Sequence, residues 1–176
     1  MYMEFRAKSK ETKDWVIGSG VFVGPYEVTI VFNNYAYQTK EEGEHSYIFS
    51  SFGEKEQVIK DTIGRFTGYI DNSHVKAYEG DIVQIKHRKN EITSEVGVIK
   101  FGEYHPFQKL KEYNQSPSHL GYYISVKKVL CSPFSITEVP VNEQVSISFI
   151  DVVNNGEIKV IGNIFDNPEL LELNER

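Results

Sequence analysis

Short runs of β-branched and aromatic residues, separated by turn-forming residues, recur along most of this chain. Aromatic residues make up 13% of the sequence, and together with many Val and Ile they favour the half-buried surface of a pleated sheet. The pattern corresponds to about nine strands against two or three short helices. We therefore expect a mainly β (α+β) protein with an N-terminal β-hairpin region and a few short helices.

The expected strands are apolar runs that end at Gly, Pro, Asn or Asp. They cover a hairpin over residues 15–32 and single strands over residues 47–49, 66–70, 82–85, 92–101, 122–130, 145–153 and 157–165. The strand over 82–85 should pair with 92–101 across a polar tip at residues 86–90. Asn154-Asn155-Gly156 is the strongest hairpin signal, so we expect it to join the last two strands.

Helical spacing of apolar residues appears in three places. The expected helices cover residues 54–63, residues 104–115 and the segment that follows Asn167-Pro168, with Leu170, Leu171 and Leu173 on its apolar face. In the last segment an Asp or Asn cap, a proline in the first turn and an early glutamate favour a helix start.

Glycines inside strands predict strong curvature between residues 66 and 101. Glu79-Gly80-Asp81 stands at the entry to one strand, and Gly97 lies inside its expected partner. Glycines in such positions mark bulges or the corners of barrels. We expect this part of the chain to form a small SH3-like barrel segment.

Length and charge limit the other possibilities. At 176 residues we expect one domain over residues 1–176, with residues 1–60 as a candidate N-terminal β subdomain. A net charge of −6 argues against nonspecific coating of nucleic acid. No run approaches the roughly 18 apolar residues of a membrane span, and charges from the fourth residue onward argue against a signal peptide. The lone Cys131, which we expect to be a small buried hydrophobe, fits a reducing cytoplasm.

Four blocks of sequence resemble the YopX-like family of phage and prophage proteins. They are E-F-R-A at residues 4–7 with Trp15, F-T-G through Y-E-G-D-I-V at 66–83, G-V-I-K-F-G at 97–102, and I-G-N-I-F-D-N-P-E-L-L at 161–171. The resemblance implies a phage or prophage origin, expression in the cytoplasm of a bacterial host, and a function not assigned to known chemistry. One departure is Asn72-Ser73-His74, where we would expect a glycine turn.

Two carboxylates beside Gly80 are the first candidate for chemistry. Glu79 and Asp81 could hold a divalent metal or act as acid and base. The interpretation we favour is a structural turn, in which Gly80 adopts positive φ and Asp81 caps backbone N–H groups. The five histidines, at positions 45, 74, 87, 105 and 119, are scattered without paired spacing, so we expect no zinc site and no cofactor.

The densest positive charge is the tip formed by Lys86, His87, Arg88 and Lys89, with Lys76 and Lys100 nearby. One interpretation is that it follows a nucleic-acid backbone, with Tyr69 or Tyr78 stacking on bases. The other is a solvated hairpin end that prevents a sheet edge from pairing with another copy.

Aromatic residues near the ends of segments are the third candidate. Tyr113, Tyr122, Tyr123 and Phe134 could form a surface patch at an interface between copies of the chain. The leading hypothesis is a non-catalytic accessory protein that binds a host or phage protein, or forms a homo-oligomer. Nucleic-acid binding through the basic tip is the alternative, and an enzyme centred on Glu79 and Asp81 is the third.

Overall fold

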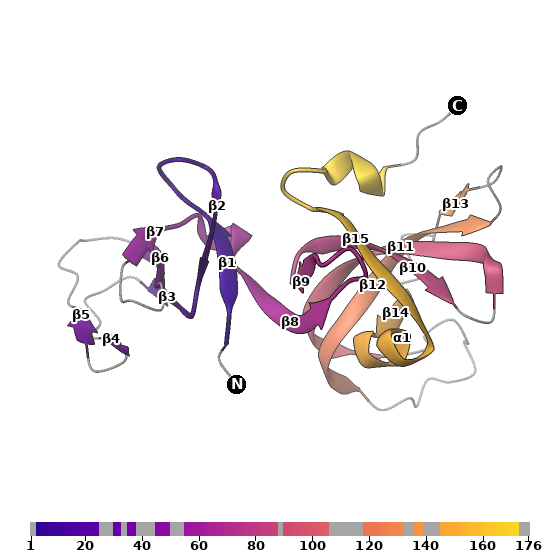
Figure 1. Cartoon of the computed structure of the whole chain (residues 1–176), viewed down its shortest axis with the longest axis horizontal. Helices are drawn as coiled ribbons and strands as arrows, with labels where there is room; N and C mark the ends of the chain where they lie inside the picture. Colours follow the sequence, from indigo (N-terminus) through magenta and orange to yellow (C-terminus); the bar gives the residue numbers. More distant parts are fainter. Residues whose placement is uncertain are drawn as a thin grey trace. The chain divides into compact units, whose positions relative to one another are not determined.

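A computed structural model describes residues 3–24, 30–32, 35–37, 45–49, 55–87, 90–105, 118–131, 136–138 and 145–172. The chain divides into two compact units, Met1–Phe66 and Thr67–Arg176. Antiparallel strands dominate both units (Figure 1). The predicted mainly β class is therefore confirmed.

The first unit consists of short antiparallel strands. Its elements are β1 (Phe5–Lys8), β2 (Trp15–Gly18), β3 (Gly20–Gly24), β4 (Ile30–Phe32), β5 (Tyr35–Tyr37), β6 (His45–Phe49), β7 (Lys55–Gln57), the 3₁₀ helix η1 (Lys60–Thr62) and the first residues of β8 (Gly64–Ile70). β1 pairs with β2 and with the start of β8, whereas β6 pairs with β3 and β7. β4 pairs with β5.

The hairpin predicted over residues 15–32 is wrong. Trp15 pairs with Lys8 of β1, whereas Val21 pairs with Ile48 of β6, so the two halves of the first apolar run belong to different sheets. Apolar alternation specifies which face of a strand is buried, but it does not specify the partner strand.

The helix predicted over residues 54–63 is also wrong, apart from the single turn η1. The Ile59 N–H donates to the Lys8 carbonyl at 2.9 Å, and the Lys10 N–H donates to the Gln57 carbonyl at 2.8 Å. These long-range bonds use backbone groups that a helix would need for its own ladder. They also bury Val58 against a core of Phe5, Ala7 and Ile48.

The second unit is a larger sheet with one α-helix among its described residues. Its elements are the end of β8, β9 (Lys76–Tyr78), β10 (Asp81–His87), β11 (Asn90–Tyr104), β12 (His119–Cys131), β13 (Ile136–Glu138), β14 (Val145–Ser148), α1 (Phe149–Asn155), β15 (Gly156–Asn163) and the 3₁₀ helix η2 (Pro168–Leu171). The strand order is β13-β12-β11-β10-β15, and β14 also pairs with β12. β9 lies next to β8.

The predicted pairing of residues 82–85 with 92–101 is confirmed, with Ile82 opposite Val98. The register between β11 and β12 shifts between Val96 and Gly97, as the glycine inside the strand predicted. A Cβ atom at Gly97 would lie 2.6 Å from both the Ile124 side chain and the Ser125 carbonyl oxygen. The described strands form open sheets and no closed barrel, so the SH3-like barrel is not confirmed.

Both faces of this sheet are covered, because successive residues of β10 enter different cores. Val83 and Ile85 pack with Phe149 and Val152 of α1, whereas Ile82 packs toward Leu170 of η2. Figure 1 shows α1 and the yellow turn η2 on opposite sides of β10 and β15. Burial on both faces explains why three of the four residues at 82–85 are apolar, with Gln84 as the exception.

The predicted strand over 145–153 is correct only as far as Ser148, because α1 begins at Phe149. The predicted hairpin at Asn154-Asn155-Gly156 is wrong. These residues end α1, and the Asn155 side-chain amide donates to the Asp151 carbonyl at 2.9 Å. A Cβ at Gly156 would lie 2.7 Å from the Lys86 carbonyl oxygen, so close packing requires this glycine. The predicted C-terminal helix is the 3₁₀ turn η2, without a side-chain cap bond from Asn167.

The helix predicted over residues 104–115 meets the structure only at its start. Tyr104 ends β11, and residues 106–117 lie outside the described part of the chain.

Candidate interaction surfaces

The Glu79-Gly80-Asp81 corner is built from backbone hydrogen bonds. Asp81 is only 1% exposed, and its Oδ2 accepts the Tyr78 N–H at 2.7 Å. Gly80 has a φ of +86°, its N–H donates to the Ile99 carbonyl at 2.9 Å, and its carbonyl accepts the Ile164 N–H at 3.0 Å. The left-handed conformation that the sequence predicted for Gly80 is present, and the Asp81 carboxylate is engaged by the backbone at this turn.

Asp71 organises the turn before this corner. One of its oxygens accepts the N–H groups of Ser73 (2.8 Å) and Val75 (2.9 Å), and the other accepts the Val160 N–H at 3.1 Å. Burial raises the pKa of the Asp71 carboxyl, but these three donors and the charge of Lys159 outweigh burial and lower the pKa below its ordinary value. In the sequence, Asp71 stands directly before Asn72-Ser73-His74, a run of residues that commonly form turns.

His74 takes the place of the glycine that the family pattern led us to expect. It has a φ of 64°, and its N–H donates to the Asp71 carbonyl at 2.9 Å. Left-handed backbone is uncommon outside glycine, although His adopts it more readily than most residues. The turn is therefore maintained here by the bonds of Asp71 rather than by glycine.

The basic tip lies at the end of β10. Lys86 and Lys76 are exposed, whereas Arg88 and Lys89 fall outside the described residues. His87 contacts Glu95 at 3.2 Å, and Lys86 stands opposite Glu157 in the β10–β15 register. These carboxylates lower the positive potential on which phosphate binding depends.

A hollow of about 640 Å³, here called the polar hollow, lies beside this tip. It is lined by Tyr69, Asn72, Lys86, His87, Glu157 and neighbouring residues, and the Asn72 amide donates to Glu157 at 2.7 Å. Tyr69 packs edge-on against Phe149 with ring centroids 5.9 Å apart. Tyr78 is only 4% exposed, so the base-stacking role considered for it does not fit its burial.

A second hollow, here called the apolar hollow, lies between the start of β12 and the start of α1. It measures about 690 Å³, and Tyr104, Leu120, Tyr122, Phe149 and Ile150 supply its apolar lining. Leu120 is 77% exposed and Ile150 is 62% exposed. Two large aliphatic side chains therefore extend into water beside a recess lined with aromatic rings.

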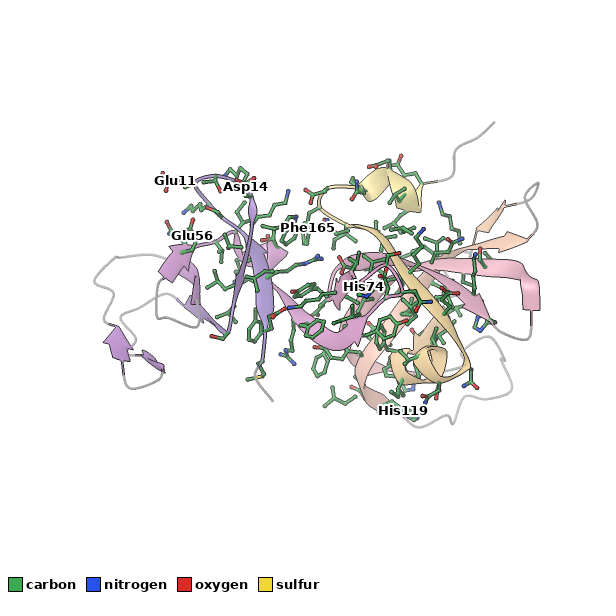
Figure 2. All side chains as sticks on the ribbon, in the orientation of Figure 1. Glu11, Asp14, Glu56, His74, His119 and Phe165 are labelled. Atoms are coloured by element: carbon green, nitrogen blue, oxygen red, sulfur yellow. The ribbon has the colours of Figure 1, made fainter. Side chains whose placement is uncertain are left out.

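The polar groups around the apolar hollow stand at its edge. They include the exposed side chains of His119, at the start of β12, and Asp151, in the first turn of α1. Figure 2 shows His119 on the same side of this unit as α1. An apolar centre with a polar edge is the usual composition of a surface that docks a protein.

The aromatic residues predicted to form an interface differ in their ring contacts, and the structure describes only some of them. Tyr122 is half-buried and meets Phe101 edge-on, with centroids 5.1 Å apart. Tyr123 is stacked on Tyr104 at 4.9 Å. Tyr113 and Phe134 lie outside the described residues, so the structure brings only part of the predicted patch together.

Sequence reasoning missed Leu120 and Ile150. Ile150 was assigned to a strand, although Ser148 and Asp151 have the Ser-x-x-Asp spacing that marks a helix start. Phe149 and Val152 also have helical spacing, and both are buried. Leu120 carried no comparable signal, because a single leucine between His119 and Gly121 has no periodic pattern.

The remaining residue types considered for chemistry stay apart. Within the described ranges no three His, Cys, Asp or Glu side chains are grouped so that they could hold a metal ion. The same part of the chain contains no helix long and apolar enough to span a bilayer. Cys131 lies in β12 opposite Thr93, and its side chain is not among those described.

A comparison with models of protein families gives a match over most of the chain. The family model described as YopX protein matches residues 4–172. The chain belongs to the YopX family. The match confirms the resemblance seen in the sequence, and it extends through both compact units. Searches of curated proteins and of solved structures give no match.

Three of the four YopX-like blocks meet at Gly80. The block at residues 66–83 contains Gly80, the block at 97–102 contains Ile99, and the block at 161–171 contains Ile164. The N–H and carbonyl of Gly80 bond to Ile99 and Ile164 respectively. Residues of three YopX-like blocks therefore build this corner. Thr67, from the block at residues 66–83, also lines the apolar hollow.

Proposed function

We propose that this YopX-family protein is a non-catalytic accessory protein of phage or prophage origin. It works in the cytoplasm of a bacterial host by binding protein partners, either a host or phage protein or another copy of itself. The observation that carries the proposal is the exposure of Leu120 (77%) and Ile150 (62%) beside the apolar hollow.

Burial of these side chains would provide the binding free energy. Full burial of one Leu or Ile side chain is worth about 1.5–3 kcal/mol, so two of them form a substantial part of a binding site. Exposed aliphatic residues are ordinary when they stand singly, whereas a group of them with a polar edge indicates an interaction surface. Leu120 and Ile150 line one hollow together, which supports an interaction surface.

The corner at residues 79–81 supports a structural role rather than catalysis. The Asp81 carboxylate is 1% exposed and accepts a backbone N–H, so it is committed to the turn. A catalytic or metal-binding carboxylate needs access to its substrate or ion.

The test is a pull-down in which tagged and untagged copies are co-expressed in host cells, run with and without nuclease. The comparison is between wild type and the double variant Leu120→Ser/Ile150→Ser, with Val75→Ser as the matched control. Val75 is also an exposed aliphatic residue of the second unit, 43% exposed, but it does not line the hollow.

We expect a partner that survives nuclease, is retained by Val75→Ser and is lost with the double variant. Near-UV circular dichroism confirms that each variant is folded. Recovery of the same proteins by wild type and by the folded double variant would overturn the proposed surface.

The alternative function is nucleic-acid binding through Lys86, Arg88, Lys89 and Lys76. The exposure of Lys86 and Lys76 supports it, whereas Glu95 and Glu157 beside the tip weigh against it. Its test is the affinity of wild type and of Lys86→Gln/Lys76→Gln for single-stranded DNA at several salt concentrations. A steep salt dependence that becomes shallower in the variant would favour this alternative.

A further inference from the structure

We infer that the occupant of the apolar hollow is a second copy of this chain, docked by a two-fold symmetric contact. This inference rests on the proposed function, and it names one partner among those that the proposed function allows. Three observations carry it: the shape of the surface, the placement of two polar side chains, and the absence of charge along the start of β12.

The surface combines protruding and recessed apolar parts. Leu120 and Ile150 project into water, and the recess beside them is lined by Tyr104, Tyr122 and Phe149. In a two-fold contact the same patch faces itself, so projections from one copy need recesses on the other. A patch that carries both features close together meets this condition without any further surface.

The polar edge is self-complementary as well. His119 offers an imidazole N–H donor, and Asp151 offers a carboxylate acceptor. Both side chains are exposed, and both border the same hollow. A two-fold contact would place His119 of one copy against Asp151 of the other, and it would form this pair twice.

The start of β12 lacks the charges that would oppose such a contact. Residues 119–126, H-L-G-Y-Y-I-S-V, contain no Lys, Arg, Asp or Glu. Residues 119–123 are the exposed or half-buried part of this stretch, whereas Ile124, Ser125 and Val126 are already buried. Covering residues 119–123 therefore removes no Lys, Arg, Asp or Glu side chain from water.

The experiment is sedimentation equilibrium of the full chain, which gives the dissociation constant of the dimer. We compare wild type with Leu120→Ser, with His119→Asp, and with the double variant His119→Asp/Asp151→Lys. The matched controls are Val75→Ser, and Lys127→Asp as a charge reversal on the same strand outside the hollow. Circular dichroism shows whether each variant is folded.

We expect wild type to dimerise and Leu120→Ser to weaken the dimer by about tenfold or more. His119→Asp places two carboxylates in contact and should weaken the dimer by at least about tenfold. The double variant restores opposite charges, so it should recover most of this loss. The two controls should leave the dissociation constant within about twofold of wild type.

Three results would overturn the inference. They are a wild-type chain that remains monomeric up to about 100 μM, a Leu120→Ser variant that dimerises as tightly as wild type, and a folded double variant as weak as His119→Asp alone. The proposed function fails differently. A host protein still captured through Leu120 and Ile150 by a monomeric chain would leave the proposed function standing and remove only the self-association.

Discussion

The carboxylate of Asp71 accepts the backbone N–H of Val160 at 3.1 Å, across 89 positions of the sequence. The same side chain accepts two N–H groups of its own turn, so it links the β8–β9 connection to β15. Three backbone N–H donors therefore satisfy the hydrogen-bond acceptors of this buried carboxylate.

Asp71→Asn should lower the free energy of unfolding by about 1–3 kcal/mol. The amide NH₂ group would face at least one backbone N–H, so donor would meet donor at a site that is only 4% exposed. Urea denaturation measures the change. Glu103→Gln, which neutralises an exposed carboxylate on β11, is the control and should leave the midpoint unchanged. Equal midpoints for both variants and wild type would remove Asp71 from the account of stability.

The contribution of Asp71 should depend on pH. The pKa of its carboxyl is lowered in the folded chain from an ordinary value of 3.8, so the stabilisation is present above that value and is lost as the pH falls through the lower folded pKa. The stability difference between wild type and Asp71→Asn should therefore be constant near neutral pH and shrink below about pH 4. Urea midpoints of both proteins over this range provide the measurement. A difference that grows on acidification would contradict the sign of the shift.

Substitution of Gly80 tests the corner at which the YopX blocks meet. Gly80→Val should cost about 1–3 kcal/mol because a β-branched residue rarely adopts a φ of +86°. Gly80→Asn should cost less, since Asn tolerates left-handed backbone. The nearest atom to an added Cβ is 3.5 Å away, so a difference between the two variants reports on backbone conformation more than on space. Equal midpoints for Gly80→Val and wild type would disprove the strain.

Gly97 tests steric space instead. Gly97→Ala places a methyl group 2.6 Å from both the Ile124 side chain and a carbonyl of β12, so we expect a loss of about 1–3 kcal/mol in thermal or urea unfolding. Gly121→Ala on β12 is the matched control, because an added Cβ there meets nothing within 4 Å. Both variants gain the same methyl group, and only the first should be destabilised. Two equal midpoints would show that the bulge relaxes around the methyl group.

Local chemistry determined which parts of the fold could be predicted. The β10–β11 pair was predictable because Gly80 and the polar tip mark both ends of the first strand, and Ile82, Val83 and Ile85 lie between them. The helix α1 could not be predicted, because Asn155-Gly156 taken by itself is typical of a β-hairpin turn. In the folded chain, Gly156 is required by the backbone of Lys86, which is remote in sequence.

A surface could likewise be predicted only where its residues are neighbours in the sequence. The basic tip could be found from sequence because charges are adjacent along the chain, whereas the apolar hollow unites residues from five elements. The exposure of Leu120 and Ile150 depends on which neighbours cover them, and no pattern of residues in one segment encodes it. The sequence therefore led to the hypothesis of a partner-binding protein without identifying the surface that we now propose.

The central place of β10 has a consequence for synthesis on the ribosome. β10 lies between β11, which follows it directly, and β15, which is translated much later. Ile82, Val83 and Ile85 are fully buried in the finished sheet. Until Gly156–Asn163 has emerged, one edge of β10 and these side chains lack their native cover, which is the condition under which nascent chains aggregate. Cover for this edge and for these side chains is therefore complete only when the last strand of the sheet has been synthesised.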